Sequence, residues 1–114
     1  MPVRRRRPAK VVRPRETEKD FMRAVVGLAE AYGYKVYHPW TSIKSAPGFP
    51  DLTCVRPATR GRPGRLCFIE VKVEHGKLTP HQALWLALLN DSVPGVHALC
   101  VRPSDWDQLV EWLK

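Results

Sequence analysis

Apolar residues recur along the chain with two different periods, and the change of period separates helices from strands. Between residues 18 and 32 they return every three to four positions, which predicts a helix. Thr17 and Asp20 supply a cap at its start, and Gly33 supplies a stop. Shorter apolar and β-branched runs between turn residues predict four strands, at residues 34–38, 51–56, 65–74 and 96–101.

Two further helices are predicted in the second half of the chain. Thr79 is a helix cap with Pro80 at the first helical position, and a closing helix starts at Ser104. One face of the earlier helix carries Gln82, Trp85, Leu86 and Leu89. The order α-β-β-β-α-β-α predicts an α/β fold with a small mixed four-stranded sheet flanked by helices.

The two middle strands form a predicted hairpin that carries three ionisable residues. If Arg56 lies opposite Arg65, then Asp51 lies opposite Glu70, with Cβ atoms about 5 Å apart. Two carboxylates that close repel each other unless a cation lies between them, and hard divalent cations prefer oxygen ligands. Lys72 shares the face of Glu70 because side chains alternate along a strand. The alternative is an exposed ion pair on a half-buried strand and a turn aspartate.

The motif Pro50-Asp51 followed by Glu70-Val71-Lys72 resembles that of the PD-(D/E)XK nuclease superfamily. Further blocks are similar to its VRR-NUC (virus-type replication-repair nuclease) branch, namely residues 48–52, 70–72 and 76–82. The resemblance implies a restriction-endonuclease-like core that uses Mg²⁺ or Mn²⁺. It implies Asp51 and Glu70 as direct ligands, with the main-chain carbonyl of Val71 completing the site. Lys72 would position or help to deprotonate the attacking water and stabilise the transition state.

The resemblance also implies roles for two residues that open helices. Glu18 is predicted on the buried-facing stripe of the first helix, and the matching residue of the family helps to hold the metal, often through water. A favourable contact with the helix dipole is the alternative. Gln82 would orient Lys72, the water on the metal or a phosphate. A structural hydrogen bond is the alternative for Gln82.

Positive charge is concentrated at the start of the chain. The formal net charge is +8, and residues 1–15 hold seven of the 19 Lys and Arg residues and none of the 11 acids. We expect residues 1–15 to form a flexible arm and residues 16–114 to form one nuclease domain. The arm would bind phosphates without sequence preference through Arg4, Arg5, Arg6 and Arg7. A solubilising tail and a membrane-surface or targeting role are the alternatives.

The loop that leads into Asp51 is the second candidate for DNA contacts. Lys44, Ser45 and Gly48 supply a cation, a hydroxyl and a glycine that permits close backbone approach to a phosphodiester. The alternative is an ordinary polar connection in which Trp40 fills the core. The sequence favours neither interpretation.

Cysteine and histidine usage points away from disulfides and zinc. Three isolated thiols, Cys54, Cys67 and Cys100, are predicted as small core residues, and the histidines lack zinc spacing. No segment has the length of a membrane span or the pattern of a secretion signal. We expect a cytoplasmic protein of a bacterial or phage-infected cell with no membrane partner.

The function predicted from these features is a metal-dependent deoxyribonuclease that hydrolyses phosphodiester bonds in branched DNA. A domain with one active site needs two copies to cut two strands symmetrically, so a homodimer that resolves four-way (Holliday) junctions in repair or recombination is the favoured form. Trp106 and Trp112 are large for the short closing helix and are candidates for a dimer contact. The alternatives are an inactive basic nucleic-acid-binding module and an RNA-directed nuclease of the same fold.

Overall fold

The computed structural model describes residues 17–39 and 46–114. The elements follow the predicted order α-β-β-β-α-β-α, with one 3-10 turn added before the last helix. They are α1 (Glu18–Ala31), β1 (Lys35–Tyr37), β2 (Leu52–Arg56), β3 (Arg65–Val71), α2 (Pro80–Ser92), β4 (Val96–Val101), η2 (Pro103–Asp105) and α3 (Trp106–Leu113). Within the described residues, no helix is both long and apolar enough to cross a bilayer.

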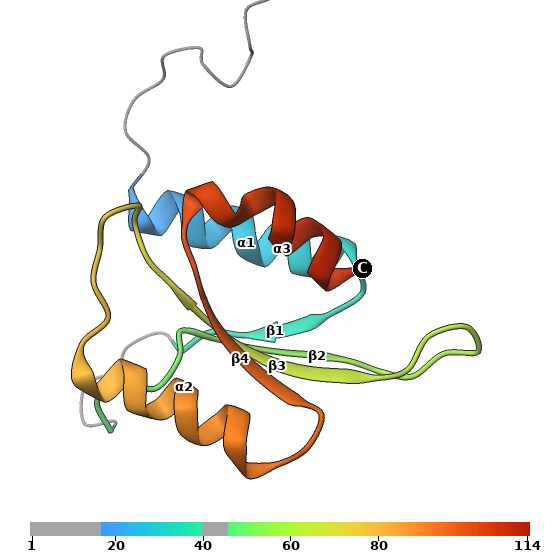
Figure 1. Ribbon diagram of the computed structural model, residues 1–114. Helices are drawn as coiled ribbons and strands as arrows, with labels where there is room; N and C mark the ends of the chain where they lie inside the picture. Colours follow the sequence, from blue (N-terminus) through green and yellow to red (C-terminus); the bar gives the residue numbers. More distant parts are fainter. Residues whose placement is uncertain (1–16, 40–45) are drawn as a thin grey trace, which may run out of the picture.

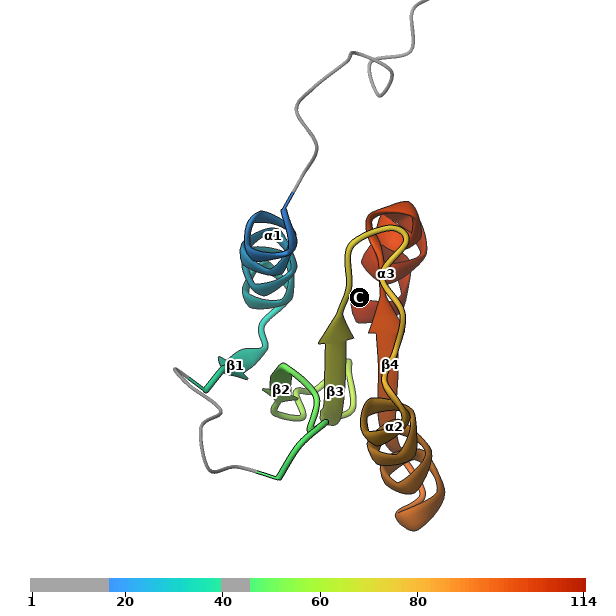
Figure 2. The same ribbon diagram turned by 90° about the vertical axis from the view of Figure 1, so that its left-hand side faces the viewer.

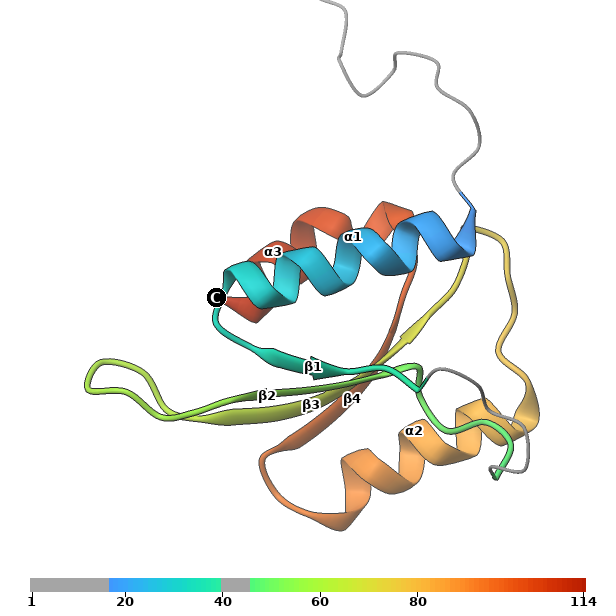
Figure 3. The ribbon, with the colours of Figure 1, turned by 180° about the vertical axis from the view of Figure 1, so that it is seen from behind.

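The four strands form one mixed sheet in the order β1-β2-β3-β4. The first three strands are antiparallel, and β4 runs parallel to β3 after the crossover through α2. α1 and α3 lie side by side over one face of the sheet, while α2 lies against the opposite face beside β4 (Figures 1 and 3). Figure 2 shows α2 close to β4 at one margin of the sheet, so α2 covers only part of this face of the sheet.

The core lies between the sheet and the pair α1 and α3. Alternate residues of β2 and β3 point to this side and are buried, as the period of two along a strand predicts. α1 contributes Phe21, Val25 and Ala29, whose spacing of four residues places them on one helix face. The apolar members of this cluster from the sheet and α3 are Leu52, Cys54, Cys67, Ile69, Val71, Val101, Leu109 and Leu113.

The helix caps confirm the predicted helix starts. The backbone N–H of Asp20 donates to Thr17 Oγ1 at 3.0 Å, which satisfies one of the free donors of the first turn of α1. α2 begins with a complete capping box between Thr79 and Gln82, with Pro80 at its first position. Thr17 and Thr79 are the predicted caps, whereas the bond from the Gln82 side chain was not part of the predicted cap.

Strand ends differ from the prediction. β3 ends at Val71 and not at residue 74, because its partner β4 ends at Val101, which pairs with Val71. The N–H of Lys72 still donates to the Val101 carbonyl at 3.0 Å, and the chain then turns away. β1 and β2 are also shorter than predicted, and α3 starts after η2 at Trp106.

Two arginines anchor the end of α3, a contact that the sequence analysis did not predict. Arg56 is 3% exposed and donates to the Leu113 carbonyl at 2.8 Å, while its guanidinium lies 4.7 Å from the centre of the Tyr34 ring. Arg65 donates to the Trp112 carbonyl and lies 4.6 Å from the centre of the Trp112 ring. Cations suit the unpaired carbonyls at a helix C-terminus.

The tryptophans proposed as a dimer contact pack within the chain. Trp106 lies 6.4 Å from Phe21 between ring centres, and Trp112 lies 5.8 Å from His97. Both rings are half-buried against the core cluster. Their large surface is therefore used to hold α3 on α1 and β4.

Candidate active site

The β2–β3 hairpin brings the two predicted carboxylates together. The observed register pairs Arg56 with Arg65 and Leu52 with Ile69, as the hairpin loop predicted. Continuing this register by one step sets Asp51, the residue before β2, opposite Glu70. The hairpin therefore positions one acid from each strand at the same end of the sheet.

A hydrogen bond across the hairpin holds Asp51 in place. Asp51 Oδ2 accepts from the backbone N–H of Val71 at 2.8 Å. His38 Nδ1 lies 3.3 Å from the main-chain oxygen of Asp51, so the end of β1 also contacts this turn. The carboxylate is thus oriented by the backbone of the residue that follows Glu70.

Glu70 is buried with half of its carboxylate unpaired. The residue is 2% exposed, and Oε1 has no hydrogen-bond partner among the residues that the structure describes. Its other oxygen, Oε2, lies 3.9 Å from Lys72 Nζ. A buried carboxylate oxygen without a donor is costly, and such an oxygen is a good ligand for a cation.

The electrostatics of the pair disfavour two free carboxylates. Burial, together with the neighbouring charge of Asp51, raises the pKa of Glu70 to about 7, although Lys72 acts in the opposite direction. Burial also raises the pKa of Asp51, despite the hydrogen bond from Val71. Both acids would be stabilised in their charged form by a cation between them.

These residues fit a hard divalent cation. Two carboxylates supply oxygen ligands, and the unpaired Glu70 Oε1 is available for a further contact. In the described ranges, no group of three or more His, Cys, Asp or Glu side chains is placed to hold a metal. Among the described residues, the carboxylate oxygens that the hairpin brings together are those of Asp51 and Glu70.

Glu18 does not occupy the buried position that the sequence analysis predicted. It is exposed in the first turn of α1. Its charge nevertheless contributes to raising the pKa of Glu70. The start of α1 and the segment that follows β3 lie at the same end of the molecule (Figures 1 and 3). The start of α1, which carries Glu18, therefore lies at the end of the molecule where the chain leaves β3.

Gln82 makes the structural hydrogen bond that was the alternative to a catalytic role. The side-chain oxygen of Gln82 accepts from the backbone N–H of Thr79 at 2.9 Å, and the backbone N–H of Gln82 donates to Thr79 Oγ1 at 3.1 Å. The amide nitrogen of the side chain takes no part in this capping box. A contact from that nitrogen to Lys72, water or phosphate remains a prediction.

α2 holds the segment that leads into Asp51. Trp85 Nε1 donates to the carbonyl of Pro47 at 3.2 Å, and the Phe49 ring lies 4.9 Å from the Trp85 ring between centres. A Cβ on Gly48, which has φ +90°, would lie 2.5 Å from the backbone carbon of His81. Trp85 is half-buried and makes this contact. The close approach of Gly48 to α2 explains the glycine independently of any phosphate.

Six predicted DNA-contact residues lie outside the described residues. They are Arg4, Arg5, Arg6, Arg7, Lys44 and Ser45. Their role stays a prediction, as does that of the arm as a whole.

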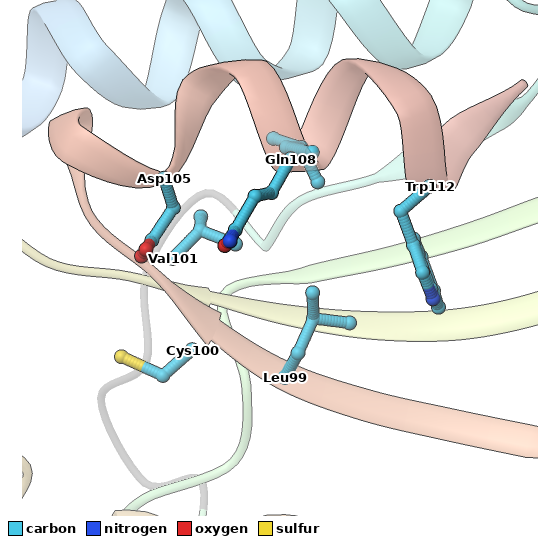
Figure 4. Close-up of a pocket in the computed structure, with 7 residues that line it drawn as sticks. Leu99, Cys100, Val101, Asp105, Gln108 and Trp112 are labelled. Carbon is cyan, nitrogen blue, oxygen red and sulfur yellow. The ribbon is translucent and has the colours of Figure 1, made fainter.

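A hollow of about 220 Å³ lies between β4 and α3, away from the α2 face (Figure 4). Asp105, Gln108 and Trp112 point toward it from the helical side. The remaining lining residues are Leu99, Cys100, Val101 and Leu109. None of the predicted site residues lines this hollow, so we separate it from the candidate active site.

Comparisons with known proteins agree with this fold. A model of the VRR-NUC domain matches residues 35–103, which include Asp51, Glu70, Lys72 and Gln82. A Fanconi-associated nuclease 1 homolog from Arabidopsis thaliana is 38% identical over 68 residues, which are 60% of this chain and 7% of that protein. A solved structure of a VRR_NUC domain matches with a TM-score of 0.63 and 26% identity, covering 82% of this chain and 94% of that one. Since the family model spans more than half of the chain, the chain belongs to the VRR-NUC domain family.

Proposed function

We propose that the protein is a metal-dependent deoxyribonuclease that hydrolyses phosphodiester bonds. The observation that supports this most is the pair Asp51 and Glu70, held opposite each other with a buried, unpaired Glu70 oxygen and Lys72 alongside. A relative named as a nuclease supports the same activity, although this chain matches only 7% of its length.

The two carboxylates and the main-chain carbonyl of Val71 would hold Mg²⁺ or Mn²⁺. These ions prefer oxygen ligands such as the two carboxylates, whereas zinc favours His and Cys, and the described residues contain no group of three or more His, Cys, Asp or Glu side chains placed to hold it. The bound ion would supply an activated water and neutralise charge on the phosphate. Glu18 would support the ion through water from the first turn of α1.

Lys72 would act on the reacting phosphodiester. Its ammonium lies beside Glu70 and its side chain is 14% exposed, so it can reach a substrate at the surface while it stays held by the acid. There it would donate a hydrogen bond to the phosphate or position the attacking water, and it would stabilise the negative charge of the transition state. Gln82 would orient Lys72 through the side-chain amide nitrogen of Gln82.

We further propose that the substrate is branched DNA and that the working form is a homodimer. One chain carries one such site, so two symmetric cuts in a four-way junction require two chains. The arginines of residues 4–7, with Lys44 and Ser45, would bind phosphates and add affinity that falls with salt. Phosphate contacts carry no sequence information, which suits recognition of DNA structure.

The test compares the protein with Lys72→Ala and with the exposed control Lys77→Ala on labelled linear, flap and four-way DNA and on RNA. In Mg²⁺ or Mn²⁺, Lys72→Ala should lower the single-turnover rate by about 10²–10⁴-fold, and Lys77→Ala should change it little. Binding of uncleaved DNA in EDTA should persist in all three proteins. Cleavage that survives both EDTA and Lys72→Ala would overturn the site, and cleavage of RNA alone would overturn the substrate.

A further inference from the structure

β3 and β4 end side by side, because Val71 pairs with Val101 at the last step of the parallel ladder. The N–H of Lys72 donates to the Val101 carbonyl at 3.0 Å, so the register continues one residue beyond β3. This register places Arg102, the residue after β4, next to Lys72. Because side chains alternate along neighbouring strands, both cations lie on the face of the sheet that carries Glu70.

The Arg102 guanidinium bonds both to the turn that follows β3 and to β4 itself. Its Nη2 donates to the Gly76 carbonyl at 2.7 Å, and its Nη1 lies 3.6 Å from Cys100 Sγ, a weak acceptor. Cys100 pairs with Glu70 in the register of β3 and β4. One half-buried arginine therefore joins the strand residue beside Glu70 to the turn that follows Lys72.

Gly76 contacts the stem of the Lys72 side chain. A Cβ built on Gly76 would lie 3.5 Å from Lys72 Cδ and 3.1 Å from Val73 Cγ2. The Gly76 N–H also closes the turn at residues 73–76, because it donates to the Val73 carbonyl at 3.0 Å. The Lys72 side chain is 14% exposed, and its Nζ lies 3.9 Å from Glu70 Oε2. The position of this ammonium therefore depends on where the turn lies.

A second bond joins the same turn to the segment after β4. The backbone N–H of Ser104 donates to Glu74 Oε1 at 2.9 Å. We call the bond from Arg102 to Gly76 and the bond from Ser104 to Glu74 the turn clamp. The backbone N–H of Arg102 donates to Asp105 Oδ2 at 2.8 Å, so the end of β4 stays fixed when the arginine side chain is removed.

We propose that Arg102 is a positioning residue for Lys72. Through the turn clamp, Arg102 holds residues 73–76 against the end of β4 and so keeps the Lys72 ammonium beside Glu70. A bond from a guanidinium to a carbonyl is charge-assisted and is stronger in a half-buried place than in water, so its loss should release the turn. The inference rests on the proposed function, to which it adds a residue that acts without touching the DNA.

The first experiment is a double-mutant cycle on the full chain, measured as single-turnover cleavage of labelled four-way DNA in saturating Mg²⁺. Arg102→Ala should lower the rate by about 10–100-fold, because a catalytic group displaced by about 1 Å loses up to about 100-fold. Lys72→Ala/Arg102→Ala should match Lys72→Ala within about 2-fold, because Arg102 acts through Lys72. The matched control is Arg23→Ala on α1, whose side chain is 70% exposed, and it should cut at the unmodified rate.

Binding of uncleaved four-way DNA in EDTA separates positioning from a direct contact. The Kd of Arg102→Ala should stay within about 2-fold of that of the unmodified protein, whereas loss of a phosphate contact would weaken binding and make it less dependent on salt.

Amide hydrogen exchange in EDTA without DNA measures the turn clamp independently of activity. Arg102→Ala should speed exchange of the Gly76 N–H by about 10-fold, because the turn then opens locally. The N–H of Ile69, in the middle of β3, should exchange as in the unmodified protein, which verifies that the sheet is folded. Glu74→Ala should have a smaller effect in the same direction on both exchange and cleavage. Glu74→Gln keeps the Oε1 acceptor and should behave like the unmodified protein.

Failure of this inference and failure of the function give different results. Faster exchange at Gly76 in a protein that cuts no DNA supports the turn clamp and overturns the activity. Cleavage at the full rate without the Arg102 side chain overturns the inference and leaves the activity standing. Additive losses in the cycle also overturn it, because Arg102 then acts independently of Lys72. If Arg102→Ala unfolds the sheet, the Glu74 variants decide, and equal cleavage by Glu74→Ala and Glu74→Gln overturns the inference.

Discussion

The two faces of the sheet differ in how they are covered. On the face of α1 and α3, Leu52, Ile69 and Val71 are fully buried, and Leu109 and Leu113 of α3 close the core above them. On the opposite face, α2 lies beside β4 and buries none of its residues. The candidate active site belongs to this second face, where Glu70 is the neighbour of two core residues on its own strand.

This difference separates stability from chemistry within single strands. We call the face covered by α1 and α3 the dense face and the face of α2 the open face, because α2 covers only part of it. Along β3, Ile69 and Val71 contribute to the core of the dense face, while Glu70, between them, points to the open face and is 2% exposed there. The dense face can therefore hold the backbone rigid while the open face carries an unpaired carboxylate oxygen and a strained pair of acids. Functional groups that are costly in isolation persist where the surrounding structure determines their position.

Matched leucine truncations should expose the contrast most strongly. Leu109→Ala on α3 removes a side chain that is 2% exposed and should cost about 2–5 kcal/mol in the free energy of unfolding, through lost burial and a cavity. Leu88→Ala on α2 removes a side chain that is 48% exposed and should change the free energy of unfolding by at most about 0.5 kcal/mol. Urea denaturation of both variants, at a protein concentration low enough to keep them monomeric, measures the difference.

Equal costs for the two truncations would contradict the contrast between the faces. Such a result would mean that α2 packs as tightly as α3 in solution. Leu113→Ala provides a second measurement on the dense face, since that side chain is fully buried. It should resemble Leu109→Ala.

The acids of the open face should make metal-free stability fall as pH rises. The pKa of Glu70 is about 7 in the folded protein and 4.5 in its ordinary range, so the folded state binds its proton more tightly. The stabilising contribution is complete below pH 4.5 and is lost as pH rises through about 7. In EDTA, Glu70→Gln should therefore be more stable than the unmodified protein by about 1–3 kcal/mol at pH 8 and by little at pH 4.5.

Urea denaturation at the two pH values, with Glu30→Gln as an exposed control, measures this effect. Mg²⁺ added at pH 8 should stabilise the unmodified protein and leave Glu70→Gln nearly unchanged, because binding of a cation to the folded state offsets the repulsion. A Glu70→Gln variant that is less stable than the parent at pH 8 in EDTA would show that the carboxylate is already satisfied.

Local signals explain how much of this arrangement the sequence predicted. The helix starts follow from Thr17 and Thr79, and the hairpin register follows from symmetric turn residues, so the meeting of Asp51 and Glu70 was predictable. These features depend on neighbours within one element or one turn. The order of elements followed for the same reason, because each periodic run is long enough to be recognised.

Features that depend on distant partners were missed. The end of β3 is set by the length of β4, although Val73 continues the apolar alternation. The anchoring of α3 by Arg56 joins residues 57 positions apart. On α2, the stripe with Leu86 and the stripe with Leu84 are both apolar, so the period alone does not reveal which one stays exposed. Each case needs knowledge of what lies across the fold.

The smallest effect that we predict concerns the link between α2 and the active site. Gly48 has φ +90°, and a Cβ there would overlap the backbone of His81 at 2.5 Å. In Gly48→Ala, the segment before Asp51 should move away from α2, because a capped helix yields less readily than a loop. The free energy of unfolding should fall by about 1–2 kcal/mol, the ordinary cost of positive φ for alanine. Cleavage should fall by about 10-fold, since Asp51 shifts with the segment.

The matched control is Gly61→Ala in the hairpin loop, where a Cβ meets nothing within 4 Å and φ is not positive. It should leave both unfolding and cleavage unchanged. Cleavage rates measured as a function of Mg²⁺ concentration distinguish a misplaced Asp51 from a weakened fold. A folded protein with a displaced Asp51 should need more Mg²⁺ and should still cleave more slowly when Mg²⁺ is saturating. If Gly48→Ala lost stability but cut DNA at the full rate, α2 would brace the loop without positioning the acid. The open face would then hold the site through β2 and β3 alone.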